Sequence, residues 1–129
     1  VFRSSDDYPA VNLDNNLLTC TTSNDKILYY FDSNKLIKIN ETLSYVKGDD
    51  PIVYSNDLMN YKQIVSKLDA LDGVESALTE TTTGFIISIV IDYNSASYSA
   101  LSYKTNIYDK NTLAKVINFE MGAKYYTCK

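Results

Sequence analysis

The sequence predicts an α+β protein, in which helices cover one face of an antiparallel sheet of about five strands in the order β-β-β-α-β-β-α. Two observations lead to this prediction. Alternating apolar residues, typical of strands, occur in paired segments separated by turn residues, and two other segments carry apolar residues at steps of three and four, typical of helices. The length of 129 residues is that of one domain with a core of its own.

Residues 1–16 are expected to form a flexible N-terminal tether, and residues 17–129 a single α+β domain. The first segment is polar, contains Pro9 and is rich in acids and amides. The domain begins at LLTCTTS (residues 17–23), whose β-branched residues and alternating polarity predict a first strand.

A hairpin follows, with its turn near Ser33–Asn34. Apolar residues at every second position give each arm one core-facing side. In the first arm these residues are Ile27, Tyr29 and Phe31, and in the second arm they are Ile37, Ile39, Leu43 and Tyr45. The GDDP segment at residues 48–51 interrupts the alternation and is expected to end this hairpin.

The most distinct element is an amphipathic helix over residues 55–73. Its apolar residues recur at steps of three and four and predict one buried face. They are Leu58, Tyr61, Ile64, Val65, Leu68 and Leu71. Ser55 or Asn56 is expected to cap its start, and Gly73 to end it.

A second hairpin is expected from residue 74 to 94, with its turn around Thr83–Gly84. Its second arm, FIISIVI (residues 85–91), is apolar on both sides, so it is expected in the middle of the sheet or under a helix. Residues 94–101 favour a loop or a single helical turn. A last helix is predicted over residues 109–122, capped by Asp109 and ended by Gly122, and KYYTCK (residues 124–129) favours a short final strand or an extended tail.

The charge of the chain argues against a nucleic-acid partner. A net charge of −4 with scattered lysines does not supply the concentrated basic face that nucleic acids require. The longest apolar run, residues 85–91, is too short to span a bilayer. The first residues lack the apolar core of a signal peptide, so in an exported protein this chain would be a mature or trimmed form.

The two cysteines, Cys20 and Cys128, allow one intramolecular pairing. In a reducing compartment they would be two buried thiols, and in an oxidising one they would close a loop of almost the whole domain. Both lie in polar, strand-like segments and not in apolar runs, which favours the disulfide. The predicted site residues are therefore the disulfide pair Cys20 and Cys128, with no catalytic, cofactor-binding or metal-binding residue.

Catalytic motifs are missing from the sequence. There is no histidine, which removes the commonest general base and metal ligand, and no CxxC pair or glycine-rich phosphate loop. The remaining acids are unpatterned and are expected to be solvated turn or tether residues. They are Asp6–Asp7, Asp49–Asp50, Asp69 and Asp72. The tripeptide Asn40-Glu41-Thr42 fits a glycosylation sequon but is expected to be a chance match within a strand.

The central segments YKQIVSKLDALDGVESALTETTTGFIISIVIDYN and NKLIKINETLSY resemble the YehR-like bacterial lipoproteins. The resemblance covers approximately residues 17–122, lies in the order and spacing of elements, and includes no catalytic motif. It implies a small α+β domain, exported and anchored by a lipidated N-terminal cysteine, with no established activity. The lipid-attachment cysteine is not in this sequence, and the pair Cys20 and Cys128 is not part of the family pattern.

The expected function is that of a non-enzymatic extracytoplasmic domain, secreted or anchored at the bacterial cell surface, that binds a protein partner or a small ligand without a cofactor. Exposed tyrosines, which are abundant in the chain, would suit recognition on an uncovered sheet face. Two alternatives remain open: an assembly module that forms homodimers through edge strands, and a histidine-free hydrolase that uses carboxylates.

Overall fold

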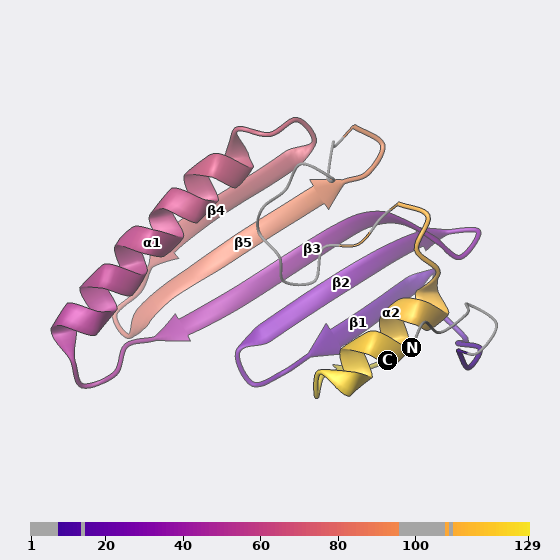
Figure 1. Cartoon of the computed structure of the whole chain (residues 1–129), viewed down its shortest axis with the longest axis horizontal. Coiled ribbons are helices and arrows are strands. Elements are labelled where there is room, and N and C mark those ends of the chain that lie inside the picture. The colour runs from indigo at the N-terminus through magenta and orange to yellow at the C-terminus, as the bar shows by residue number, and fades with distance from the viewer. Residues whose placement is uncertain (1–7, 14, 96–107, 109) are drawn as a thin grey trace, which may run out of the picture.

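Burial alternates along the strands and divides the sheet into a core face and an open face. The structure is a computed structural model that describes residues 8–13, 15–95, 108 and 110–129. Its elements are β1 (Leu17–Thr21), β2 (Asp25–Asp32), β3 (Lys35–Val46), α1 (Pro51–Asp69), β4 (Val74–Glu80), β5 (Gly84–Asp92), α2 (Ala114–Ala123) and β6 (Thr127–Cys128). The strands form one antiparallel sheet in the order β4-β5-β3-β2-β1-β6 (Figure 1).

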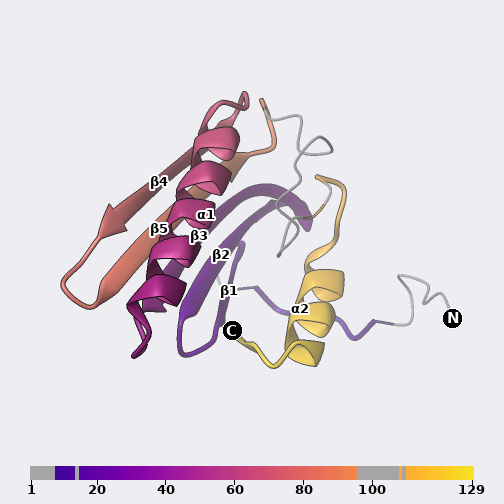
Figure 2. The ribbon, with the colours of Figure 1, turned by 60° about the vertical axis from the view of Figure 1, so that its left-hand side comes forward.

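The predicted α+β class is confirmed, with six strands where about five were expected, because the C-terminal segment does form a short strand. Both helices lie on the same face: α1 over the β4–β5 side and α2 over the β1–β6 side (Figure 2). Their buried residues join the inward residues of the strands in one core cluster. No described element covers the opposite face of the sheet.

Strand β5 lies between β4 and β3, as its two apolar sides predicted. Its residues Phe85, Ile87, Ile89 and Ile91 are all buried on the core face. Residues Ile86 and Val90 point to the open face, where they are exposed and half-buried respectively.

The hairpin of β2 and β3 has the predicted turn, but one residue that was predicted to face the core, Ile37, does not. Ser33 and Asn34 both have positive φ (52° and 66°), the geometry of the tight turn that matches strand twist. A β-bulge then pairs Phe31 with Leu36 and Tyr30 with Lys38, so that Ile37 is an extra residue. The prediction that Ile37 shares the core face was therefore wrong, because Leu36 occupies that position and is buried.

Helix α1 begins at Pro51, four residues before the predicted start. The Asp50 carboxylate caps it by accepting hydrogen bonds from the backbone N–H groups of Ile52 (2.9 Å) and Val53 (3.3 Å). The prediction of Ser55 or Asn56 as the cap was wrong. Proline suits the first helical turn because the N–H that it lacks would have no partner there, so Asp50–Pro51 starts the helix.

Glycine is required at position 84, where the β4–β5 hairpin meets β3. A Cβ added to Gly84 would lie 1.8 Å from the backbone oxygen of Tyr45. Thr81 closes the turn: its hydroxyl accepts from the Gly84 N–H (3.0 Å), and its own N–H donates to the Gly84 carbonyl (2.8 Å). The predicted hairpin is thus confirmed, and it fixes one end of β5 against β3 and α1.

Helix α2 spans Ala114–Ala123, shorter than predicted. The expected cap, Asp109, and most of the expected 94–101 loop lie outside the described residues. Gly122 was expected to end the helix, but it lies inside the last turn. Backbone hydrogen bonds from Ala114 to Asn34 (3.2 Å) and from Leu36 to Thr112 (3.2 Å) attach the start of α2 to the β2–β3 turn.

Candidate functional site

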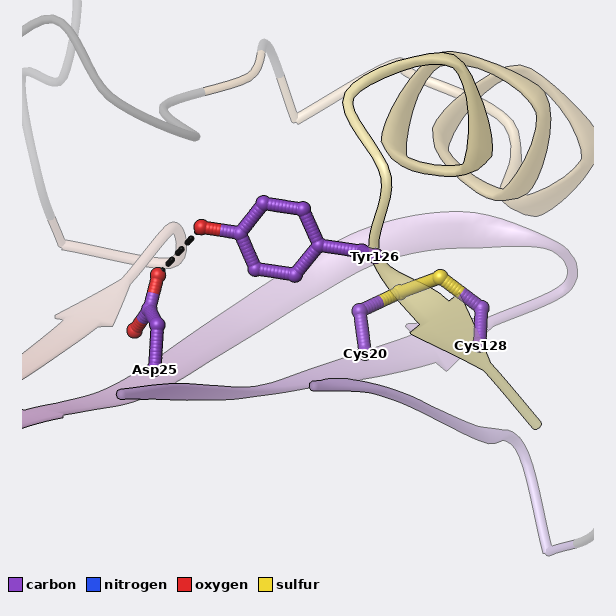
Figure 3. The surroundings of a disulfide bond; sticks show 4 residues. All are labelled: Cys20, Asp25, Tyr126 and Cys128. Atoms are coloured by element: carbon purple, nitrogen blue, oxygen red, sulfur yellow. Dashed lines mark hydrogen bonds between the residues drawn. A yellow bond between two sulfur atoms is a disulfide. The ribbon is translucent and has the colours of Figure 1, made fainter. Parts of the chain in front are cut away.

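The predicted disulfide between Cys20 and Cys128 is present and joins the two ends of the domain (Figure 3). The two cysteines lie directly opposite each other in β1 and β6, with Cα atoms 4.1 Å apart. Beside them, Thr19 and Lys129 exchange backbone hydrogen bonds of 3.0 and 2.9 Å, so the cysteines occupy the closer, non-hydrogen-bonded type of pair. The bond therefore fixes an edge strand of only two residues to the sheet.

A group of acids and phenols lies beside the disulfide on the core face. We call it the acid–tyrosine cluster, and it consists of Asp25, Tyr29, Glu41, Tyr108 and Tyr126. The Tyr126 hydroxyl donates a hydrogen bond to Asp25 Oδ2 (Figure 3). Tyr29 packs edge-on against Tyr108, with ring centroids 5.9 Å apart. Asp25 and Glu41 are both buried and lie diagonally across the β2–β3 pair, because Asp25 faces Leu43 and Ile27 faces Glu41.

Two phenols of the cluster, those of Tyr29 and Tyr108, are held in the protonated form. Burial raises the pKa of Tyr29 far above its usual range, and the nearby Tyr108 and Glu41 raise it further. Burial also raises the pKa of Tyr108, with Glu120 and Tyr126 acting in the same direction. A phenol that stays protonated can donate hydrogen bonds but cannot serve as a base or nucleophile near neutral pH. The chemistry of the cluster suits a structural network.

Three polar atoms of this cluster are buried without a hydrogen-bond partner in the described part of the chain. They are Asp25 Oδ1 and the hydroxyl oxygens of Tyr29 and Tyr108. Tyr29 is completely buried, so its hydroxyl carries the full cost of losing its water contacts.

Asp25 and Glu41 were not predicted to be buried, and Glu41 was considered only as the middle residue of the Asn40-Glu41-Thr42 sequon. A signal was present, since Asp25 is in phase with Ile27 and Tyr29 along its strand, and Glu41 lies between Ile39 and Leu43 at the same spacing. An acid at an inward position of an alternating strand is unusual, because buried carboxylates are costly. These two acids are distinguished from the other acids by their inward position in the alternation of a strand, and not by their residue type.

The acids that were expected to be solvated turn or tether residues have structural roles or face solvent where the structure describes them. Asp50 caps α1, and Asp69 Oδ1 accepts a hydrogen bond from the Ser76 N–H (3.1 Å). Asp49 and Asp72 are exposed, and Asp6–Asp7 lie outside the described residues. Within residues 8–13, 15–95, 108 and 110–129, no three acids or cysteines form a group that could hold a metal ion.

The open face of the sheet is the second candidate site. Two rows of side chains run across strands β1 to β5, one residue from each of these strands. The first row is Thr19, Leu28, Asn40, Val90 and Glu75, and the second is Thr21, Lys26, Thr42, Ser88 and Ala77. Most of these side chains are uncharged, and the two charged residues, Lys26 and Glu75, lie away from the β3–β5 centre. Asn40 of the sequon is half-buried at this centre.

The tyrosines do not form the expected recognition surface. Tyr45, Tyr54 and Tyr61 pack around Phe85 between α1 and the sheet. Tyr45 stacks on Phe85, with ring centroids 4.6 Å apart. The Tyr45 hydroxyl donates to Asp57, and this bond raises the pKa of Tyr45. Among the described tyrosines only Tyr125 is fully exposed, so the open face does not carry a cluster of exposed tyrosines.

A shallow hollow of about 490 Å³ borders the open face at the ends of β4 and β5. It is lined by Lys38, Asp72, Glu75 and Asp92 together with apolar residues including Leu71 and Val90. The side chains at its rim are half-buried or exposed and of mixed charge, and they do not enclose a small molecule.

No protein-family model matches the chain, and neither a curated protein nor a solved structure is detectably similar to it. Neither described helix is long and apolar enough to cross a membrane.

Proposed function

We propose that this protein is a non-enzymatic extracytoplasmic domain that binds a protein partner through the open face of its sheet. The observation that carries the proposal is this face itself: a six-stranded sheet with helices on one side and, on the other, a surface that is uncharged at its β3–β5 centre. The central residues are Asn40, Thr42, Ser88 and Val90, and the charged residues Lys26, Lys38, Glu75 and Asp92 lie around them. Sheets with one uncovered face normally alternate between apolar inward and charged or polar outward residues. Low charge at the centre is typical of the middle of a protein interface.

An extracytoplasmic location is supported by the disulfide between Cys20 and Cys128, because such bonds persist mainly in oxidising compartments. Anchoring through a lipidated N-terminal cysteine, as in the YehR-like lipoproteins that the sequence resembles, is part of the same proposal. A non-enzymatic role is supported by the acid–tyrosine cluster, because the pKa values of Tyr29 and Tyr108 are raised and both phenols stay protonated near neutral pH.

The experiment is site-specific photo-crosslinking in the cells that produce the protein. A photoreactive amino acid at Asn40, in the centre of the open face, is compared with the same amino acid at Lys124, which is exposed at the C-terminal end of α2. We expect discrete crosslinked adducts from position 40 and none from position 124. The absence of adducts at position 40, or identical adducts at both positions, would show that the open face does not bind a protein.

The compartment is tested separately. In cells fractionated without reductant, the protein is expected in the extracytoplasmic or membrane fraction with both cysteines resistant to thiol alkylation. Recovery of the protein in the cytoplasm with two free thiols would contradict the proposed extracytoplasmic location. It would not decide whether the open face binds a partner, which the crosslinking experiment tests.

A further inference from the structure

We propose that α1 forms a homodimer interface, in which its outer face packs antiparallel against α1 of a second copy. This inference concerns a surface on the opposite side of the molecule from the open face of the sheet. It does not depend on the proposed binding of a protein partner.

The outer face of α1 carries a neutral stripe, which consists of Ile52, Asn56, Met59, Gln63 and Ser66. These positions are separated by steps of four and three residues, so they follow one line along the helix. They alternate with the sheet-facing line of Tyr54, Leu58, Tyr61, Val65 and Leu68, and every residue of the stripe is exposed. The stripe is about 21 Å long, from 14 residue steps of 1.5 Å.

The absence of charge on this stripe is unusual for a surface helix, whose outer face normally carries charged residues. Three of the four charged residues of α1 are turned towards the sheet, and the fourth, Lys67, is exposed in the last turn, four residues after Gln63 and at the edge of the stripe. Asp57 accepts from the Tyr45 hydroxyl, Lys62 pairs with Glu80 at 3.4 Å, and Asp69 accepts from the Ser76 N–H.

Large apolar side chains are exposed along the same part of the helix. Ile52 and Met59, both in the stripe, are 71% and 59% exposed, and the adjacent Val53 is 52% exposed. Exposed apolar groups together with depleted charge and an exposed methionine are characteristic of association surfaces.

The binding partner that the neutral stripe fits is a second copy of the chain. An antiparallel arrangement with a twofold axis at Met59 places Met59 beside Met59 of the second copy and Asn56 beside Gln63 of the second copy, where their amides can exchange hydrogen bonds. Each copy carries a net charge of −4, so two copies repel each other, and a neutral surface minimises that repulsion. The stripe is narrow, so the interface is smaller than the standard size of about 1,600 Å² and the dimer is expected to be weak.

Sedimentation velocity of the disulfide-bonded protein tests the proposal between about 10 µM and 1 mM, the range in which a small interface would dissociate. We expect a reversible monomer–dimer equilibrium that strengthens with added salt, because salt screens the repulsion between two acidic copies. Met59→Lys is expected to weaken dimerisation at least about tenfold, since it places two lysines together on the axis. Thr42→Lys, which adds the same charge on the open face, is the matched control and should dimerise like the parent.

Replacement of the methionines by photo-methionine, a photoreactive analogue, tests the same interface by crosslinking without any change of charge. Met121 is completely buried, so intermolecular crosslinks are expected only from Met59, joining α1 to α1. A protein that stays monomeric at the highest concentration would overturn the proposal, and a dimer unaffected by Met59→Lys would place the interface elsewhere. Neither outcome bears on the open face, whose crosslinks from position 40 are measured separately.

Discussion

Two tyrosine-to-phenylalanine substitutions in the acid–tyrosine cluster should have opposite effects on stability. Each removes one hydroxyl oxygen and keeps the ring. The Tyr29 hydroxyl is completely buried and has no hydrogen-bond partner within the described part of the chain, whereas the Tyr126 hydroxyl donates to Asp25 Oδ2. We therefore expect Tyr29→Phe to stabilise the protein and Tyr126→Phe to destabilise it.

The magnitudes follow from what each hydroxyl does. A buried polar group without a partner costs about 1–3 kcal/mol, so Tyr29→Phe should raise the free energy of unfolding by about 1 kcal/mol and the thermal midpoint by about 4 °C. A hydrogen bond to a carboxylate is worth about 1.5–3 kcal/mol, and Tyr126→Phe should lower the free energy of unfolding by about that amount.

The dependence of stability on pH above 10 provides a second test of the buried Tyr29 hydroxyl. The pKa of Tyr29 is raised in the folded protein relative to about 10 in the unfolded chain, so its contribution is complete below pH 10 and is lost as the pH rises above 10. Above pH 10 the free energy of unfolding should fall by about 1.4 kcal/mol per pH unit because of Tyr29. Tyr108 acts in the same direction, because burial also raises its pKa. Tyr29→Phe should therefore make the alkaline loss of stability less steep.

Urea unfolding of the disulfide-bonded protein, monitored by circular dichroism at neutral pH and at several pH values above 9, measures both effects. Equal m-values would show that the variants unfold from a comparably compact state. Destabilisation by Tyr29→Phe as large as that by Tyr126→Phe would refute the reasoning, since it would mean that the Tyr29 hydroxyl makes a favourable bond. An unchanged alkaline slope would refute the pKa argument separately.

The remaining predictions concern the turn, the helix start and the disulfide. Gly84→Ala should cost about 3 kcal/mol because its Cβ would overlap the Tyr45 carbonyl, whereas Gly48→Ala, with open space around it, should change stability by less than about 0.5 kcal/mol in the same urea assay. Asp50→Ala should remove the α1 cap and lower stability by about 1 kcal/mol, and an unchanged urea midpoint would contradict the capping role. The double variant Cys20→Ala/Cys128→Ala should lose up to about 4.8 kcal/mol for a closed loop of 108 residues, and a loss below about 1 kcal/mol would show that the bond does not restrain the unfolded chain.

Local patterns were sufficient to predict most of the fold. The apolar residues on both sides of FIISIVI placed β5 inside the sheet, and the turn residues Ser33 and Asn34 fixed the first hairpin, because both features depend only on neighbouring residues. The start of α1 was missed for a local reason as well: Asp50–Pro51 was interpreted as a break, although the same pair is a good helix start.

Other features could not be predicted from neighbouring residues. The bulge at Ile37 depends on how β3 pairs with β2, and a shift of one residue reverses which side chains face the core. The acid–tyrosine cluster depends on β2, β3 and the C-terminal segment meeting in three dimensions, and Tyr126 is 101 residues from Asp25. The cysteine pairing was predictable because two cysteines allow only one intramolecular bond, whereas its location at a sheet edge was not.

The two proposed surfaces face in opposite directions, because α1 and the open face lie on opposite sides of the sheet. In a dimer joined through the neutral stripes, both open faces therefore point outwards. Such a dimer can hold two copies of a partner, one on each side, but its two open faces cannot reach partners on the same surface. The combined arrangement therefore predicts a complex of two copies of the protein and two of the partner at concentrations where the dimer forms. Met59→Lys should reduce this complex to one copy of each, as measured by light scattering, and leave the affinity of the open face for the partner unchanged. A complex of one copy of each from the parent protein at these concentrations would contradict the combined arrangement.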